Sequence, residues 1–300
     1  MLTASDIKAK AKELGATVCG IGSLDLFENE DIQRDPKMIL PNAKCIIGFG
    51  FAVPKGLYMT MDIGSQYYTY TSMGVKYIDE EMTEIFLLKI GGMIENEGYD
   101  ACLQKSIPNL RIKGDKTTNP EVMDTYELIH AVPVADGKPT PDVIIDFGKA
   151  SKACGIGEKG LNGKIINKDY GPFIRYCFII TDAPLEIDAP LTENICDNCG
   201  ECIKACPGNA ISDDGLDSWQ CAVYYKGAHK SNPFMTEAFL KGDPEREAIL
   251  NGKKRFDSDS ARKIFKEMDF LPNTQWGYAP CLCGRKCDIA CYRHLKGEIK

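Results

Sequence analysis

Two periodicities of apolar residues alternate along the first 187 residues of the chain. Ile7, Ala11 and Leu14 recur at helical spacing between Thr3, a favourable N-cap, and Gly15, a favourable helix stop. Further helices are expected at about 77–97 and 147–154. Short apolar runs bounded by glycine or proline predict buried strands at 18–21, 45–51, 143–145 and 176–181. This alternation predicts a layered α/β domain over residues 1–187, followed by a separate domain over residues 188–300.

The second predicted domain begins with closely spaced cysteines. Cys196, Cys199, Cys202 and Cys206, with Pro207 directly after them, form the pattern C-x2-C-x2-C-x3-C-P. This is the bacterial ferredoxin run, in which three thiolates hold one [4Fe–4S] cluster and the fourth ligates a second cluster. A four-cysteine zinc site would normally use two separated C-x2-C pairs. Disulfides are disfavoured by the close spacing and by the lack of a secretory signal, so we predict iron–sulfur clusters.

The remaining cysteines are sufficient for a second cluster. Cysteine ligands exchanged between the two sites, as in two-cluster ferredoxins, predict a first set of Cys196, Cys199, Cys202 and Cys291 and a second set of Cys206, Cys221, Cys283 and Cys287. Cys281 competes with Cys283, which lies one position earlier than the ferredoxin spacing requires, and we favour Cys283. The other five cysteines lie in apolar surroundings and are expected to pack as small hydrophobic residues: Cys19, Cys45, Cys102, Cys154 and Cys177.

Composition fits an enzyme better than a simple electron carrier. The chain has 300 residues, 44% of them hydrophobic, and the cysteine pattern occupies only about the last third. Fourteen cysteines without a signal peptide predict a reducing cytoplasm, and no apolar run is long enough to span a membrane. The net charge of −7 disfavours nucleic acid as a partner, and the basic cluster 253–255 is expected to be a solvated surface.

A glycine-rich segment lies near the end of the first predicted domain, between the helix expected at 147–154 and the strand expected at 176–181. Gly155, Gly157, Gly160 and Gly163 leave a backbone that a flat or bulky ligand can approach closely. The letters match the dinucleotide pattern G-x-G-x-x-G, but the run follows an expected helix rather than a strand, which argues against NAD. The alternative is a glycine-rich connector that binds no ligand.

At this point the sequence resembles a known superfamily. Residues 153–185, with Gly-Ile-Gly-Glu, Tyr170-Gly171-Pro172, Arg175 and Ile-Ile-Thr-Asp-Ala-Pro-Leu, resemble the core of the reductive dehalogenases and, more distantly, the epoxyqueuosine reductases. The resemblance implies an N-terminal corrinoid-binding α/β domain followed by a small ferredoxin-like domain with two [4Fe–4S] clusters. It also implies a base-off cobalamin held by the glycine-rich segment, at Gly155, Gly157, Glu158, Gly160, Gly163 and Gly171.

The resemblance implies a reductase. An external donor such as a ferredoxin or flavodoxin would reduce the clusters, which pass electrons to the corrinoid, and the corrinoid would reduce a small organic substrate. Candidate proton donors are Tyr126, Lys164 and Tyr170, although a strand residue, a surface charge and a loop-packing residue are the simpler interpretations of the three.

The sequence also departs from both families. The twin-arginine export signal of respiratory dehalogenases is absent, Leu161 stands where their loop usually has arginine, and only nine residues follow Cys291, where epoxyqueuosine reductases continue into a helical extension. We therefore expect a cytoplasmic, reductive dehalogenase-like enzyme. The alternatives are an electron-transfer protein or activator for a partner corrinoid protein, an epoxyqueuosine reductase, or a two-cluster ferredoxin with an added domain.

Overall fold

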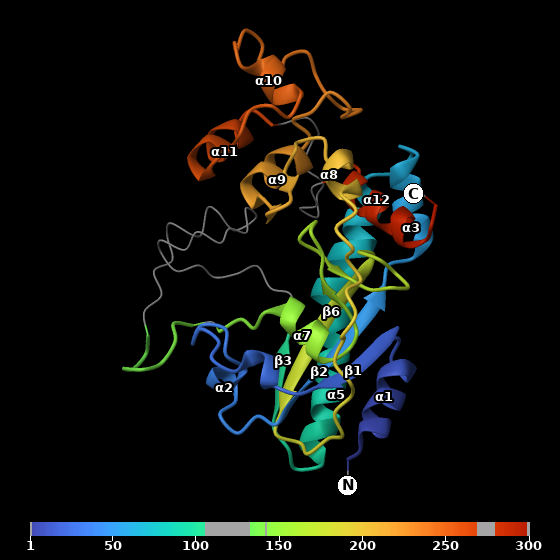
Figure 1. Cartoon of the computed structure of the whole chain (residues 1–300), viewed down its shortest axis with the longest axis vertical. Coiled ribbons are helices and arrows are strands. Elements are labelled where there is room, and N and C mark those ends of the chain that lie inside the picture. The colour runs from blue at the N-terminus through green and yellow to red at the C-terminus, as the bar shows by residue number, and fades with distance from the viewer. Residues whose placement is uncertain (1, 106–132, 142, 269–279, 299–300) are drawn as a thin grey trace.

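A four-stranded sheet forms the centre of the N-terminal part. The structure, a computed structural model, describes residues 2–105, 133–141, 143–268 and 280–298 (Figure 1). The strand order is β1-β2-β6-β3, and every neighbouring pair is antiparallel. The strands are β1 (Val18–Gly22), β2 (Cys45–Ala52), β6 (Ile174–Thr181) and β3 (Ala101–Gln104).

Three of the predicted strands are confirmed and one prediction is wrong. Residues 143–145 form no strand, because Ile145 is buried against one face of the sheet from an irregular segment and needs no pairing partner. The edge strand β3 was missed, since its residues are only half-buried and show no clear apolar run. The predicted first helix is confirmed as α1 (Ala4–Glu13), with a capping box formed by Thr3 and Asp6.

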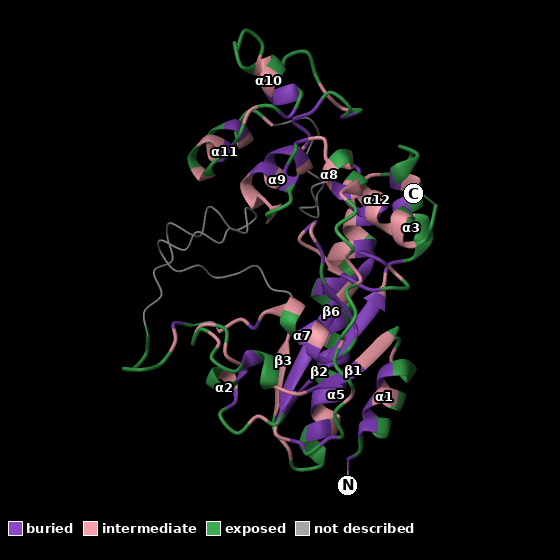
Figure 2. Ribbon diagram, viewed as in Figure 1, coloured by how far each residue is buried: buried purple, intermediate pink, exposed green. Residues whose placement is uncertain are grey.

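Both faces of the sheet are covered, which explains the nearly continuous apolar runs of β2 and β6 (Figure 2). Ile47 and Ile179 point to the face on which α1 and α5 (Thr83–Asn96) pack. Ile46 and Ile180 point to the opposite face, under α7 (Phe147–Ala153). Alternating residues of one strand therefore belong to two separate cores.

Two glycines of β1 allow the end of α7 to lie directly on the sheet. A Cβ atom on Gly20 would stand 1.9 Å from the carbonyl oxygen of Cys154, and one on Gly22 would stand 2.6 Å from the carbonyl carbon of Ala153. No larger residue fits at this distance. The contact fixes the point from which the glycine-rich segment leaves the sheet.

The C-terminal part is built from short helices. The helix α8 (Glu201–Ala205) lies within the cysteine run and packs against α12 (Lys286–Leu295), as Figure 1 shows. A separate core holds α9 (Ser218–Tyr225), α10 (Arg246–Leu250) and α11 (Ser258–Phe265). Cys281, Cys283 and Ile289 instead pack into the same core as α1 and α5. The division of the chain after residue 187 therefore stays a prediction.

The remaining elements connect these parts. They are a 3₁₀ helix (Asp25–Phe27), α2 (Pro36–Ile39), α3 (Lys55–Asp62), α4 (Tyr68–Thr71), a π-helix (Ser72–Met82), and the short strands β4 (Glu158–Lys159), β5 (Ile165–Ile166), β7 (Ile211–Ser212) and β8 (Gly215–Leu216). The helix expected over 77–97 is thus α5 preceded by the π-helix. Of the helices in the described ranges, none is long and apolar enough to cross a membrane.

Candidate iron–sulfur centres

The four cysteines of the first predicted set lie around one small cavity. Cys196, Cys199, Cys202 and Cys291 all line it, together with residues of the glycine-rich segment and of α12. The first three come from the loop before α8 and from α8 itself, and the fourth comes from α12, almost ninety positions later in the chain. The packing of α8 on α12 brings them together.

The loop between these cysteines turns through the left-handed region twice. Asn198 has φ 57° and Gly200, the N-cap of α8, has φ 76°. Asparagine and glycine are the residues that adopt this conformation at the lowest cost. The two turns wrap the chain around the cavity, which is the physical reason that two-residue gaps between cysteines suit a cluster.

The Glu158 carboxylate supports the start of this loop. Its Oε1 accepts hydrogen bonds from the backbone N–H groups of Ile195, at 2.5 Å, and Cys196, at 2.8 Å. Glu158 is 8% exposed and lies on β4, in the glycine-rich segment. We predicted a corrinoid contact for this residue, and that role stays a prediction, while the structure gives its carboxylate a position beneath the first cysteine loop.

Thiols of the second predicted set influence one another's ionisation. Burial raises the pKa of Cys221 to about 11, with the negative charge of Cys283 next in importance and that of Cys206 also contributing. Burial likewise raises the pKa of Cys287, with contributions from Cys283 and Cys221. In the first set, burial raises the pKa of Cys291 to about 12, and the charges of its three partners add to the rise.

Thiols gathered in this way are suited to a metal cluster. Each thiolate opposes the ionisation of its neighbours, and a bound cationic iron core removes that repulsion. A backbone donor is also present, since the N–H of Ala210 lies 3.3 Å from the sulfur of Cys206. Both sets therefore fit the clusters that the spacing predicted, and the assignment of individual ligands remains a prediction.

Cys281 and Cys283 remain close competitors. Their sulfur atoms lie 3.5 Å apart, and both side chains are buried. Cys283, however, is the member of the pair whose charge acts on Cys221 and Cys287. This observation supports Cys283 as the ligand.

An ion pair lies beside the second set. Arg285 and Asp288 are paired, with 9% and 0% of their surfaces exposed. Asp288 Oδ1 also accepts from Asn162 Nδ2 at 3.1 Å, so the pair is tied to the glycine-rich segment. Sequence reasoning missed all three residues. The available signal was their position: Arg285 and Asp288 flank Cys287 within two residues.

The glycines of the segment are packed against the protein itself. A Cβ atom would stand 2.6 Å from Ala189 O at Gly155, 2.7 Å from Tyr176 Oη at Gly157, and 2.8 Å from Leu216 Cδ2 at Gly163. At Gly160 and Gly171 the nearest atoms would be 3.1 and 3.2 Å away. Close packing thus accounts for the missing side chains, and the described residues do not form a cradle whose open side a corrinoid would fill. The corrinoid contacts of these residues stay a prediction.

The context argument against a dinucleotide site is supported. The glycine-rich segment follows the helix α7 and runs into the short strands β4 and β5, so no strand precedes the glycines as that fingerprint requires.

The three candidate proton donors are not brought together by the described residues. Tyr126 lies outside them. Lys164 lies close to Arg285, whose positive charge, followed by burial, lowers the pKa of the Lys164 ammonium. Tyr170 packs against the sheet core that contains α7. Lys164 is therefore the candidate that lies beside the second set of cysteines.

The predicted packing role of the other cysteines is confirmed for Cys45, Cys154 and Cys177, which are buried, while Cys19 and Cys102 are half-buried. Burial raises the pKa of each of these five thiols. They stay protonated and are poor metal ligands.

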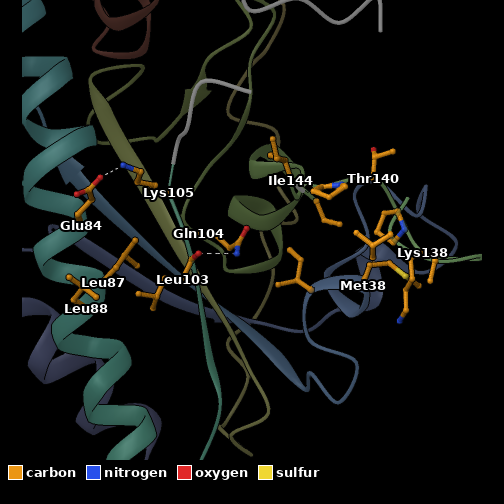
Figure 3. A pocket seen from close by; sticks show the side chains of 16 residues that line it. Met38, Glu84, Leu87, Leu88, Leu103, Gln104, Lys105, Lys138, Thr140 and Ile144 are labelled. Atoms are coloured by element: carbon orange, nitrogen blue, oxygen red, sulfur yellow. Dashed lines mark hydrogen bonds and ion pairs between the residues drawn. The ribbon is translucent and has the colours of Figure 1, made fainter. Parts of the chain in front are cut away.

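A larger hollow of about 830 Å³ lies beside β3 and α5 (Figure 3). Its lining is mainly apolar, with Met38, Leu87 and Leu103, and Figure 3 shows the ion pair of Glu84 and Lys105 at one end. No cysteine is among the residues that line it, so this hollow is separate from the two cysteine sets.

The chain is similar to several known proteins. A 4Fe-4S binding domain matches residues 190–212. An epoxyqueuosine reductase of Cyclobacterium marinum is 25% identical over 324 aligned positions, which cover 90% of this chain and 92% of that protein. A structure of epoxyqueuosine reductase with a modified tRNA-Tyr stem loop covers 97% of this chain and 81% of its own, at 17% identity and a TM-score of 0.48. A catabolic reductive dehalogenase covers 88% of this chain and 33% of its own, at 16% identity and a TM-score of 0.48.

Proposed function

We propose that the chain is an iron–sulfur oxidoreductase of the kind that includes the epoxyqueuosine reductases and the reductive dehalogenases, and that it delivers electrons through two [4Fe–4S] clusters to a corrinoid. One observation carries the proposal. The four cysteines of the first predicted set line one cavity together, and the charges of Cys283 and Cys206 act on Cys221 of the second predicted set. A single zinc ion or a disulfide framework would not need this arrangement.

The two sets differ in their access to solvent, which suggests a direction for electron flow. Cys199 of the first set is exposed, whereas Cys283 of the second set is buried beneath the sheet core. An external ferredoxin or flavodoxin would meet the first site at the surface. The protein shields the second site, where Cys221 and Cys287 lie near Arg285 and Lys164.

A bound corrinoid would supply a strong reductant and nucleophile for the substrate. The described residues do not define its cradle, and the proposed electron path through them ends at the second site. Lys164 remains our candidate for holding a proton there, because the charge of Arg285 makes its ammonium easier to deprotonate than an exposed lysine.

The substrate proposal changes from the one that the sequence favoured. We expected a reductive dehalogenase-like enzyme, but the curated relatives are named epoxyqueuosine reductases. We therefore propose an epoxyqueuosine-type epoxide as the first substrate to test. Transfer RNA then becomes a candidate carrier of the substrate, against the expectation drawn from the net charge of −7.

The test uses the full chain reconstituted anaerobically with iron, sulfide and cobalamin. About eight iron atoms and eight acid-labile sulfides per chain are expected, with absorbance that dithionite bleaches. Stoichiometric zinc or a single cluster would overturn the two-cluster proposal, and no spectral change in a cobalamin titration would remove the corrinoid.

Turnover assays then separate the substrates. Loss of epoxyqueuosine from modified tRNA, with a salt-sensitive gel shift, is the expected result. Turnover of a small halogenated compound in place of the nucleoside would restore the dehalogenase-like alternative. Reduction of a partner corrinoid protein, with neither substrate consumed, would identify an activator.

A further inference from the structure

The guanidinium of Arg285 is buried in the loop that carries the second set of cysteines. Arg285 is 9% exposed, and its guanidinium pairs with the carboxylate of Asp288, which is fully buried. Two buried charges are costly to desolvate, and the pairing alone rarely gives net stability. Stability alone therefore does not explain their burial at this position.

The backbone conformation of Arg285 is also unfavourable. Arg285 has φ 47° and follows Gly284, which has φ 63°. Glycine adopts the left-handed conformation freely, but arginine adopts it only at a cost in conformational energy. Strain of this kind persists where the surrounding structure requires it, commonly at functional sites. Here the strained residue stands between Cys283 and Cys287 in the chain, and its charged side chain is buried.

The charge of Arg285 reaches three of the four proposed ligands of the second site. Burial raises the pKa values of Cys221 and Cys287, and the Arg285 guanidinium opposes both rises. It also opposes the rise at Cys283, where the hydrogen bond with Cys281 is the main cause. Asp288 acts differently, since its negative charge helps to raise the pKa of both Cys287 and Cys291. The geometry places Asp288 near both sets, because its Oδ1 lies 3.6 Å from the sulfur of Cys287 and accepts from Asn162, which lines the cavity of the first set.

One donor of Arg285 has no acceptor. Among the described residues, its buried Nε forms no hydrogen bond. A buried N–H without a partner is uncommon and calls for an explanation. Hydrogen bonds to the sulfurs of an iron–sulfur cluster, together with nearby charge, set its reduction potential.

We infer that Arg285 raises the reduction potential of the second cluster and that Asp288 lowers the potentials of both clusters. The inference rests on the proposed function, because it requires a cluster at each site. If a cluster at the second site accepted one electron from dithionite, which would be oxidised, the Arg285 guanidinium would stabilise the added negative charge and no proton transfer would be needed. The residues tune the cluster and are not catalytic residues.

The experiment is an anaerobic redox titration with dithionite on the reconstituted full chain, followed by electron paramagnetic resonance. Arg285→Gln is expected to shift the second midpoint to a lower potential and to leave the first almost unchanged. Arg285→Lys, which keeps the charge, should restore most of the wild-type midpoint. Lys286→Gln is the matched control. It also removes one positive charge, but the Lys286 side chain, one position after Arg285, is exposed, so neither midpoint should move.

Asp288→Asn removes the negative charge of the pair and should therefore raise both midpoints, the opposite direction to Arg285→Gln. An unmoved or raised second midpoint in Arg285→Gln, or an equal shift in both clusters, would overturn the inference. If Arg285→Gln cannot hold the second cluster, the inference is tested with Asp288→Asn, which retains the guanidinium. Unmoved or lowered midpoints in Asp288→Asn would then overturn the inference. A wild-type protein with no second cluster signal would instead defeat the proposed function, so the two failures are distinguishable.

Discussion

Replacing Glu158 by alanine tests whether the glycine-rich segment supports the first cluster. Glu158 Oε1 accepts from two backbone N–H groups, those of Ile195 and Cys196. Hydrogen bonds to a charged acceptor contribute roughly 1.5–3 kcal/mol each. Because both N–H groups donate to the same oxygen, the contribution of the second hydrogen bond is smaller. Water can replace part of the loss, because Ile195 and Cys196 are half-buried. We therefore expect a loss of about 2 kcal/mol in the stability of this loop.

A loss of this size corresponds to a factor of roughly 30 in an equilibrium constant. The first cluster of Glu158→Ala should accordingly pass to an iron chelator about 30-fold more readily than in the wild-type protein. The assay follows each cluster separately by electron paramagnetic resonance during anaerobic chelator treatment. The second cluster should be lost at the wild-type rate, since Glu158 contacts the first loop.

Two further variants separate charge from geometry. Glu158→Gln keeps an amide oxygen that can accept from both N–H groups, so it should lose roughly 1 kcal/mol, about a fivefold effect. Glu193→Ala removes an exposed carboxylate two positions before Ile195 and should have no effect. Wild-type cluster retention in Glu158→Ala would refute this reasoning, and a selective loss of cobalamin binding in that variant would instead support the predicted corrinoid contact.

Three other outcomes follow from the geometry. Cys283→Ser should abolish the magnetic resonance signal of the second cluster while Cys281→Ser retains it, and the reverse would make Cys281 the ligand. Gly163→Ala should lower the thermal midpoint, because φ is +74° at this residue and the new Cβ would stand 2.8 Å from the Leu216 side chain. We expect a cost of roughly 1–2 kcal/mol or more. Gly92→Ala, in an open helical position, is the control and should be neutral or stabilising. Burial lowers the pKa of His229 to about 4, so the unfolded chain binds more protons between about pH 4 and pH 6.5, and the free energy of unfolding should fall by about 1.4 kcal/mol on going from pH 7.5 to pH 5.5. His229→Gln should remove that part of the slope in chemical unfolding curves, and an unchanged slope would contradict the buried neutral imidazole.

The sequence by itself predicted which neighbouring cysteines lie together. Spacing is local, so Cys196, Cys199 and Cys202 could be expected around one cavity from the chain alone. It also determined the first helix and three of the central strands, because periodicity and capping depend on neighbouring residues. The edge strand β3 was not predictable in this way, since a half-buried edge has no continuous apolar run.

Only the tertiary structure decided how distant segments meet. Glu158 and Cys196 are almost forty positions apart, and no pattern in the sequence indicates that a carboxylate of the glycine-rich segment supports the cysteine loop. The same holds for Asn162 and Asp288, which meet across 126 positions. The glycines looked like a surface for a flat ligand, but in the structure neighbouring protein atoms fill the space beside them. A glycine in the sequence indicates that another group approaches the backbone closely. Only the three-dimensional packing shows whether that group is a ligand or the protein itself.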